Sequence, residues 1–386
     1  MSAFSPEQIA LLSQSPTPFY CYDLKLLQET LNVVKSESAK YGFHVHYAMK
    51  ANVEDQVLEL IRAVGFGADC VSGGEVQKAL EAGFNAQQVV FAGVGKSDSE
   101  IIAALKADIF CFNCESIPEI EIINEHALAL GKKARIALRI NPNVHANTHH
   151  YITTGLEENK FGIGVNELPL VLDVIERCEA ISLMGLHFHI GSQITDLSVF
   201  KQLCIRVNEI QEWFVSRRIN IKILNVGGGL GVNYYEPDNE RIPDFAAYFA
   251  VFKRFLEIRN GQEVHFELGR AIVAQCGTLI SRALFVKKGV QTQFAVLDAG
   301  MTELIRPALY QAYHKVENLT ATPGAKMERY DVVGPVCESS DCFGKAMELH
   351  TIRRGDIIAI RTAGAYGSVM ASNYNLRQLN APIYLK

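Results

Sequence analysis

Residues 43–65 read FHVHYAMKANVEDQVLELIRAVG, and this stretch decides the fold. Its first eight residues, 43–50, alternate like a β-strand, and a helical pattern follows from about Val53. The strand ends on Lys50, where burial would make a charged amine unfavourable. A Schiff base would remove that charge, whereas a lysine that snorkels to solvent is the ordinary alternative.

The same order of strand and helix repeats along the chain to about residue 270. The predicted strands are 43–50, 67–73, 88–94, 109–114, 135–142, 183–191, 223–229 and 263–270. Helical patterns lie between them, for example at 53–65, 74–83, 97–107, 117–131 and 198–217. About eight such units predict an α/β protein with a closed (β/α)8 TIM barrel. An open doubly wound sheet is the alternative, but no GxGxxG follows the first strand.

The pattern changes after Arg270. Four segments, at 272–287, 291–298, 328–336 and 355–361, are rich in Val, Ile, Phe and Thr and end near Gly or Pro. They predict a C-terminal antiparallel β-domain, and the β-like run at 19–22 is a further strand that could join it. We therefore predict a barrel domain at 24–272 and a β-domain formed by 1–23 and 273–386.

The composition is that of an ordinary globular protein. The 386 residues are 48% hydrophobic and 20% charged, with a formal net charge of −5, so we expect neither nucleic-acid nor membrane binding. Residues 1–16, MSAFSPEQIALLSQSP, contain no basic segment and no long apolar run, and we expect no signal peptide. Nine cysteines, an odd number, then predict reduced thiols and a cytoplasmic location. Cys111 and Cys114 have CxxC spacing inside an apolar strand, which favours core packing, and we predict no metal site.

Functional residues of a TIM barrel lie at the carboxyl ends of its strands. Lys50 ends the first predicted strand, His189 lies near the end of the sixth, Gly227–Gly229 end the seventh, and Glu267 lies near the end of the eighth. Each has a structural alternative: His187 and His189 could be core histidines, and the glycines could form only a tight turn.

Taken together, an amine, an imidazole, a glycine cradle and a carboxylate match pyridoxal 5′-phosphate. Lys50 would hold its aldehyde, Glu267 would keep its pyridine nitrogen protonated, and His189 would stack on its ring. Backbone N–H groups can approach a phosphate closely at glycines. The residues expected to hold the phosphate are Gly227, Gly228, Gly229 and Ser192.

The end of the eighth strand, at Arg270, and the β-domain add candidates for substrate binding. Arg270 and Arg306 suit the grip of a carboxylate, although either could belong to a structural ion pair. Tyr310 follows Arg306 by four residues, so the two share a face if this stretch is helical. Residues 332–341, VVGPVCESSD, form a polar cluster after a strand, although this too could be an ordinary solvated loop.

Nine motifs occur in the order that one protein family shares. They are Tyr47–Asn52, Ser72–Glu75, Arg139–Pro142, Lys160–Gly162, His189–Gln193, Gly227–Gly229, Arg306–Tyr310, Gly334–Asp341 and Ala365–Gly367. From about Pro18 to its end, the chain resembles the diaminopimelate decarboxylase family of fold-type III, alanine-racemase-like pyridoxal-phosphate enzymes. One departure is Leu268, where the family has Pro, and it affects local loop geometry.

The resemblance implies decarboxylation of meso-2,6-diaminopimelate to L-lysine and CO2, the last step of lysine biosynthesis. It implies a homodimer with shared active sites, in which Cys337 and Glu338 reach the partner's cofactor. The implied catalytic residues are Lys50, His189, Glu267 and Cys337. The implied cofactor contacts are Lys50, His189, Ser192, Gly227, Gly228, Gly229, Glu267, Gly269, Arg270 and Tyr366. The implied substrate contacts are Arg270, Arg306, Tyr310, Glu338 and Tyr366.

Further activities remain open on the same fold. They are decarboxylation of carboxynorspermidine, ornithine or arginine, a pyridoxal-phosphate-dependent racemase, and a homologue that binds the cofactor without catalysis. These decarboxylases would share the cofactor residues without needing the paired arginines. A non-catalytic homologue would lack Lys50 or Cys337, and both are present.

Overall fold

The structure is a computed structural model that describes residues 4–144 and 160–386. It divides into two compact units. The barrel unit comprises Leu31–Gly231 and Asp244–Gly269. The β-unit comprises Met1–Thr30, Val232–Pro243 and Arg270–Lys386. Residues 1–3 of the predicted β-domain lie outside the described residues, and the predicted domain limits at 24 and 272 stay a proposal.

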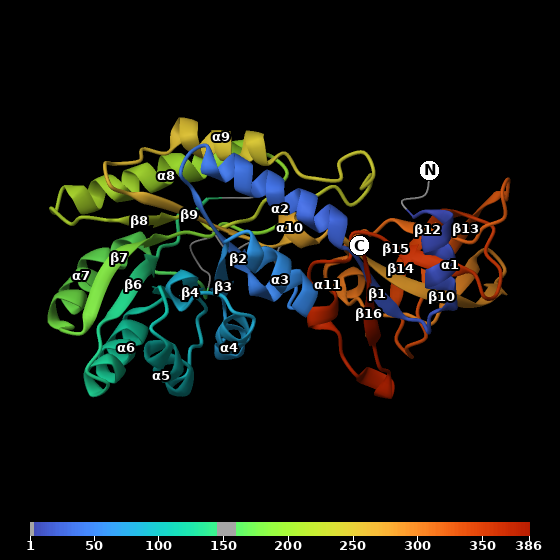
Figure 1. Ribbon diagram of the computed structural model, residues 1–386, viewed down its shortest axis with the longest axis horizontal. Coiled ribbons are helices and arrows are strands. Elements are labelled where there is room, and N and C mark those ends of the chain that lie inside the picture. Colours follow the sequence, from blue (N-terminus) through green and yellow to red (C-terminus); the bar gives the residue numbers. More distant parts are fainter. Residues whose placement is uncertain (1–3, 145–159) are drawn as a thin grey trace. The chain divides into compact units, whose positions relative to one another are not determined.

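Eight parallel strands, neighbours in chain order, close into the predicted barrel (Figure 1). They are β2 His44–Ala48, β3 Gly67–Cys70, β4 Val89–Phe91, β5 Cys111–Cys114, β6 Ala134–Arg139, β7 Ile181–His187, β8 Ile223–Asn225 and β9 Glu263–Leu268. Each overlaps one predicted strand. β3, β4, β5 and β8 are buried along their whole length, because one face fills the barrel and the other lies under helices.

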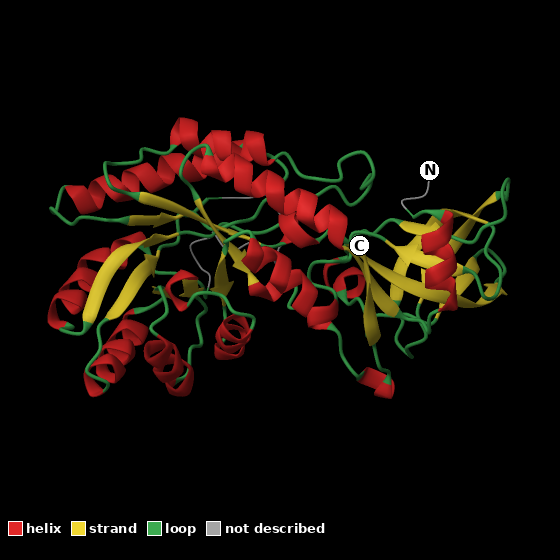
Figure 2. Ribbon diagram, viewed as in Figure 1, coloured by secondary structure: helices red, strands yellow, loops and turns green. Residues whose placement is uncertain are grey.

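Helices lie outside the strands of the barrel unit (Figure 2). Together with the connecting helix α2, they are α2 Leu24–Ala39, α3 Asp55–Ala63, α4 Gly73–Glu81, α5 Asp98–Ala107, α6 Ile117–Ala129, α7 Leu168–Arg177, α8 Ser198–Val215 and α9 Phe245–Phe255, with the short 3-10 turns η1 Met49–Ala51, η2 Ala86–Gln88 and η4 Val165–Glu167. Helices α3 to α6 and α8 were predicted, whereas α2, α7 and α9 were not. Helix α9 is apolar on most sides, and Phe249 and Phe252 pack edge-on against Phe266 of β9.

Seven of the eight barrel strands end earlier than the sequence predicted, whereas β5 ends at Cys114 as expected. Lys50 lies in η1, just after β2, and His189 lies two residues beyond β7. Gly227–Gly229 follow β8, and Gly227 leaves the extended conformation at φ 72°. The physical reason is the alternation of side chains in a strand, which directs neighbouring residues to opposite faces of the sheet. The chain must therefore leave the strand and turn before consecutive residues can all lie at the barrel rim.

The β-unit contains an eight-stranded sheet that is mostly antiparallel, as predicted. Its strands are β1 Phe19–Asp23, β10 Gly277–Lys288, β11 Gln293–Leu297, β12 Val316–Asn318, β13 Met327–Val333, β14 Cys342–His350, β15 Ile357–Ile360 and β16 Asn380–Leu385. The main path is β12-β15-β10-β11-β13-β14, and β1 pairs with both β10 and β16. Two pairs, β1–β16 and β11–β13, are parallel, which the sequence did not predict.

The β-unit also holds short helices. They are α1 Pro6–Gln14, α10 Arg270–Val273, α11 Arg306–Tyr310, η5 Ser368–Met370 and η6 Tyr374–Leu376. Helix α10 corrects the prediction, because the first residues of the segment 272–287 are helical and β10 begins only at Gly277. No helix within residues 4–144 and 160–386 is long and apolar enough to cross a bilayer. All nine cysteines are free, and Cys111 and Cys114 are buried in β5.

Candidate active site

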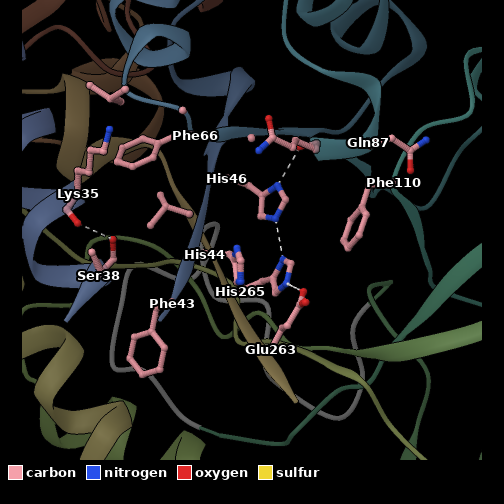
Figure 3. A pocket seen from close by; sticks show the side chains of 16 residues that line it. Lys35, Ser38, Phe43, His44, His46, Phe66, Gln87, Phe110, Glu263 and His265 are labelled. Carbon is pink, nitrogen blue, oxygen red and sulfur yellow. Dashed lines mark hydrogen bonds and ion pairs between the residues drawn. The ribbon is translucent and has the colours of Figure 1, made fainter. Parts of the chain in front are cut away.

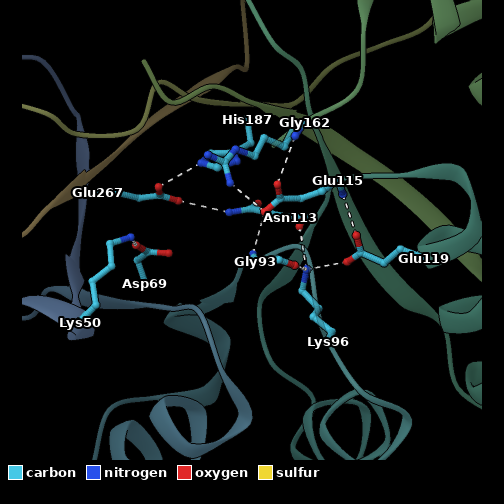
Figure 4. Close-up of polar contacts among 11 residues, drawn as sticks. Lys50, Asp69, Gly93, Lys96, Asn113, Glu115, Glu119, Gly162, His187 and Glu267 are labelled. Atoms are coloured by element: carbon cyan, nitrogen blue, oxygen red, sulfur yellow. Dashed lines mark hydrogen bonds and ion pairs between the residues drawn. The ribbon is translucent and has the colours of Figure 1, made fainter. Parts of the chain in front are cut away.

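Polar side chains gather at the carboxyl ends of the barrel strands. The strand register is responsible, because Ala48 pairs with Asp69 and His187 pairs with Asn225. Parallel strands that are paired in this way end at one rim, so their last side chains lie together. Figure 4 shows Lys50 and Asp69 beside Glu267, with His187 and Asn113 on the other side of the Glu267 carboxylate.

Lys50 lies beside a buried carboxyl group. Its Nζ is 3.4 Å from Oδ2 of Asp69, and the Lys50 side chain is 37% exposed whereas that of Asp69 is 1% exposed. Burial and the nearby Glu267 raise the pKa of Asp69 to about 7, against the opposing effect of Lys50. A contact of this length is longer than a strong charged hydrogen bond. The amine is therefore positioned by Asp69 without being locked in a tight ion pair.

Glu267 is a buried carboxylate of the rim that receives three hydrogen bonds. Its Oε2 accepts from Nε2 of His187 at 3.0 Å, and its Oε1 accepts from the amides of Asn225 at 2.7 Å and Asn113 at 3.2 Å. Burial alone would raise the pKa of Glu267, but His187 and Lys50 together bring it well below its usual range. A carboxylate has about four acceptor positions. Glu267 is therefore ionised, with one position left for a further donor.

His189 is half-buried in the segment after β7. Burial, followed by the positive charges of Lys50 and Arg139, brings the pKa of His189 well below its usual value. A neutral imidazole presents a flat face without a charge. Such a face suits stacking on an aromatic ring.

None of the three glycines after β8 leaves space for a side chain, and a Cβ on Gly227 would meet the carbonyl oxygen of Phe188 at 2.3 Å. A Cβ on Gly228 would meet the carbonyl oxygen of Glu267 at 1.8 Å, and one on Gly229 would meet that of Gly191 at 2.8 Å. Ser192 follows Gly191 and is half-buried. Among the hydrogen bonds of the described residues, none uses the N–H of Gly228 or Gly229 as donor. Two such N–H groups in a turn suit an anion.

Several buried polar atoms of this rim have no partner within the part of the chain that the structure describes. They are Oδ1 of Asp69, Oδ1 of Asn113 and Nδ1 of His187. Buried polar atoms in native proteins are normally paired, so a group of unpaired ones indicates a place for a ligand. Together with the N–H groups of Gly228 and Gly229, they fit a polar, phosphate-bearing ring.

A second buried network of hydrogen bonds and ion pairs, centred on Glu115 and Lys96, lies next to these residues (Figure 4). Glu115 accepts from Arg139 at 2.7 Å and from the N–H groups of Gly93 and Gly162 at 2.8 and 3.2 Å. Lys96 donates to Glu119 at 2.5 Å and to the carbonyl oxygen of Asn113 at 3.0 Å. Two of the sequence motifs, 139–142 and 160–162, are thus joined through Glu115.

The β-unit carries two buried guanidinium groups. Arg270 donates from Nη1 to the hydroxyl of Tyr234 at 2.6 Å, and Arg306 lies 4.8 Å from the centre of the same ring. Arg270 also lies 4.8 Å from the ring of Tyr366, a residue held at φ 56°. Aromatic faces attract cations without neutralising them. The pair keeps its positive charge for an anion.

Arg306 is oriented by a histidine. Its Nη1 donates to Nε2 of His314 at 2.8 Å, and Nδ1 of His314 donates to the carbonyl oxygen of Arg361 at 2.9 Å. Burial, then Arg306 and Arg270, lower the pKa of His314 to about 3, so the ring stays a neutral acceptor. Burial likewise lowers the pKa of Arg306, whose Nε has no partner among the described residues. Residues 306–310 form helix α11, which meets the condition for Arg306 and Tyr310 to share a face.

The polar loop after β13 has an exposed tip at residues 337–340. Cys337 and Glu338 are both exposed, and Glu338 accepts from the hydroxyl of Tyr374 at 3.0 Å. Asp341 has a structural role, since it is buried and accepts from the N–H groups of Met301 at 2.6 Å and Val336 at 2.7 Å. The loop is therefore fixed at its base by Asp341 while its tip faces outward.

The departure at Leu268 is accommodated in the sheet. Leu268 is the last residue of β9, is buried, and pairs with Tyr47 of β2. Gly269 follows, and a Cβ there would meet side chains of Ala51 and Ala48 at 3.0 and 3.1 Å. The close approach of these side chains explains why residue 269 is a glycine. Leu268 continues the strand, in which Pro could not donate a backbone hydrogen bond.

The structure adds six functional candidates that were not predicted from the sequence. Asp69, Asn113, His187 and Asn225 were not assigned to the rim, and Tyr234 and His314 were not assigned to the arginine pair. Their shared signal is a polar residue in or beside a buried segment. Polar character alone does not say which partner satisfies it, so strand register was needed to group them.

Comparisons with known proteins agree with this geometry. Residues 25–274 match the family described as "Pyridoxal-dependent decarboxylase, pyridoxal binding domain". A diaminopimelate decarboxylase of Bacteroides thetaiotaomicron is 57% identical over 364 residues, which cover 94% of each chain. One of Helicobacter pylori is 42% identical over 370 residues, covering 95% of this chain and 90% of the relative.

Solved structures give the same result. The diaminopimelate decarboxylase from Helicobacter pylori complexed with L-lysine matches with a TM-score of 0.91 at 40% identity, covering 98% of this chain and 93% of the other. The enzyme from M. jannaschii in complex with L-lysine matches at 0.89 and 35% identity, with 98% and 89% coverage. A lysine/ornithine decarboxylase from Vibrio vulnificus, at 21% identity and a TM-score of 0.85, shares the fold.

Proposed function

This chain belongs to the diaminopimelate decarboxylase family of pyridoxal-dependent decarboxylases, and on that premise we propose that it converts meso-2,6-diaminopimelate to L-lysine and CO2. The reaction is the last step of lysine biosynthesis. The observation that carries the proposal is the pair of buried guanidinium groups, Arg270 and Arg306, gathered around Tyr234. Such a pair needs an anion, and this substrate has a second carboxylate that survives the reaction.

The barrel residues fit pyridoxal phosphate. When bound, this cofactor supplies an electron-withdrawing ring that takes up the electrons of the broken Cα–carboxylate bond. We assign Lys50 to its aldehyde and the flat ring of His189 to its face. The N–H groups of Gly228 and Gly229, which have no acceptor within the described residues, support a phosphate position there, with Gly227 and Ser192. We also assign Gly269, Arg270 and Tyr366 to the cofactor's surroundings.

Glu267 holds a proton on the ring nitrogen in this proposal. Three donors from His187, Asn113 and Asn225 keep its carboxylate ionised, and its remaining acceptor position is available to an N–H group. A negative charge fixed beside a ring nitrogen favours the protonated ring. The network that surrounds Glu267 therefore supports the electronic role as well as the fold.

Arg270, Arg306 and Tyr310 are assigned to the substrate's distal carboxylate, and Glu338 to its distal ammonium group. His314 orients Arg306 as a neutral acceptor and leaves its charge intact. A decarboxylase whose substrate has no distal carboxylate has no use for two buried arginines. Ornithine, arginine and carboxynorspermidine each carry a carboxylate only at the reacting end, and they are therefore disfavoured as substrates.

We also propose a homodimer in which Cys337 and Glu338 complete the partner's site. Their exposure at the tip of a loop fixed by Asp341 supports a role outside their own protomer. The Cys337 thiol would then return a proton to Cα after CO2 leaves. Nine free cysteines support a reducing compartment, and we propose the cytoplasm.

The test is CO2 release from meso-diaminopimelate, ornithine, arginine and carboxynorspermidine under the same conditions. We expect meso-diaminopimelate to exceed ornithine in kcat/KM by about 10³-fold or more, because an absent charged group leaves buried partners unpaired. L-Lysine should appear as the product in an amount equal to the CO2. Equal turnover of ornithine would overturn the proposal. Racemisation without CO2 release would instead indicate a racemase, and cofactor binding with no turnover would indicate a non-catalytic homologue.

A further inference from the structure

A cluster of metal-binding side chains lies at the opposite end of the barrel from Lys50. It consists of His44, the first residue of β2, and of Glu263 and His265 in β9. His44 and His265 are directly paired across the seam where the first and last barrel strands meet, and Glu263 lies two residues before His265 on the same face. One ligand atom from each residue lies within 4.8 Å of the other two.

Hydrogen bonds fix which nitrogen of His265 faces this cluster. The carbonyl oxygen of Gln88 can only accept, so Nδ1 of His46, 3.1 Å away, carries a proton. In a neutral ring Nε2 of His46 is then an acceptor, and it receives Nδ1–H of His265 at 2.8 Å. A neutral His265 consequently directs the lone pair of Nε2 at Oε2 of Glu263, only 3.1 Å away.

Two acceptors at this distance require something positive between them. A tetrahedral Zn²⁺ ion with ligands at about 2.0–2.1 Å separates neighbouring ligand atoms by about 3.3 Å, close to the observed spacing. The ring of His265 is held by stacking on Phe110, with centroids 5.6 Å apart and planes 7° apart. His44 is exposed, and its ring stacks on that of His265 with centroids 4.7 Å apart, which keeps the two imidazoles side by side. Figure 3 shows the imidazoles and Glu263 converging, whereas the ammonium group of Lys35 points away.

We propose that His44, Glu263 and His265 bind a divalent transition-metal ion of the Zn²⁺ class across the closing seam of the barrel. Two imidazoles and one carboxylate are an established Zn²⁺ ligand set that leaves one position for water. The adjoining cavity of about 380 Å³ leaves room for that water. His46 is a positioning residue, because it fixes the proton of His265 on the nitrogen away from the metal.

The proposed ion serves the fold. Glu263 and Glu267 lie four residues apart on one face of β9, which corresponds to about 13 Å along a strand. The metal therefore joins β2 to β9 at the amino end of the barrel, while the residues around Glu267 lie at the carboxyl end. This inference is independent of the substrate proposed above.

Calorimetric titration of the chelator-treated holoenzyme with Zn²⁺ tests the site. We expect one ion per chain, and a rise in the thermal midpoint when Zn²⁺ is present. His44→Ala should weaken binding by about 100-fold or more and remove that rise, and His46→Phe should weaken it by about 10–100-fold. Because His44 is exposed, its variant should fold. His126, whose Nε2 lies 3.4 Å from Asp98 on the barrel surface, supplies the control. His126→Ala should bind like the wild type.

Co²⁺ substitution identifies the ligands. Nitrogen and oxygen ligands in a tetrahedral site should give visible d–d bands without a thiolate charge-transfer band, which separates this site from binding at the exposed Cys337. Failure of the wild type to take up one Zn²⁺ would overturn the proposal, and His265 would then be a protonated partner of Glu263. Unchanged affinity in His44→Ala, or a thiolate band with Co²⁺, would overturn it equally.

Discussion

Replacing Glu267 with Gln removes one charge and changes the shape of the residue little. In the wild type, the Glu267 carboxylate accepts hydrogen bonds from three donors, which belong to His187, Asn225 and Asn113. In Glu267→Gln the amide oxygen can still accept from the two asparagines, while the amide nitrogen must face His187. His187 then has to accept at Nε2 and carry its proton on Nδ1, an atom that has no partner among the described residues in the wild type. A neutral imidazole allows this change of tautomer, so the variant should fold.

The cost should therefore fall on catalysis. Without a fixed negative charge the ring nitrogen no longer keeps its proton. We expect kcat to fall by roughly two to four decades, equivalent to about 3–5 kcal/mol of transition-state stabilisation. Stability should fall by only about 1–3 kcal/mol, the range for a weakened buried hydrogen bond.

The assay is CO2 release at saturating substrate, with cofactor content measured by absorbance and unfolding measured in urea. Glu212→Gln is the matched control, because Glu212 is exposed and pairs only with Arg259 at 2.9 Å among the described residues. It should retain wild-type turnover. A Glu267→Gln enzyme that binds cofactor and turns over at nearly the wild-type rate would refute the electronic role of Glu267.

Lys50→Ala should lose the absorbance of covalently held cofactor, and borohydride should fix the cofactor on Lys50 in the wild type; fixation on another lysine contradicts the assignment. Arg306→Ala should erase most of the preference for meso-diaminopimelate over ornithine in kcat/KM while the cofactor spectrum is unchanged, and a retained preference would exclude Arg306 from the distal grip. Mixing Lys50→Ala with Cys337→Ala subunits should restore about a quarter of the wild-type activity, because half of randomly paired dimers contain one intact site; no recovery after verified exchange would place both residues in one protomer's site. Since the pKa of Asp69 is raised from 3.8 to about 7, the folded protein binds more protons there than the unfolded chain between these values, so the unfolding free energy of the cofactor-free protein should fall as pH rises through this window. Asp69→Asn should reduce that fall in urea unfolding at pH 5 and pH 8, and an identical fall would show that another group causes it.

The barrel could be predicted because each of its strands is marked by a short apolar run in the local sequence. Short apolar runs between helical patterns placed all eight strands, and the carboxyl-end rule brought Lys50, His189 and Glu267 to one rim. Helix α9 was missed because its Phe-rich sequence is apolar on most sides and hides the helical period. The exact strand ends were missed because a turn such as η1 continues the apolar composition of β2.

The partners of the functional groups could not be read from the sequence. Asn225 and Asn113 are distant from Glu267 in the chain and meet it only through the closed strand order. His314 likewise reaches Arg306 by a turn after α11. A sequence shows that a residue is polar and near buried neighbours, whereas its hydrogen-bond partner depends on register.

The pairing of β1 with β16 has a consequence for synthesis of the protein. The ribosome must make the whole barrel and most of the β-unit between Asp23 and Asn380. At about 5–20 residues per second this takes roughly tens of seconds. During that time the apolar residues Phe19, Tyr20 and Cys21 have one edge of their strand without its final neighbour. A nascent chain in this state is a natural client for chaperones that shield exposed strand edges, and the barrel can be complete before β1 of the β-unit is fully paired.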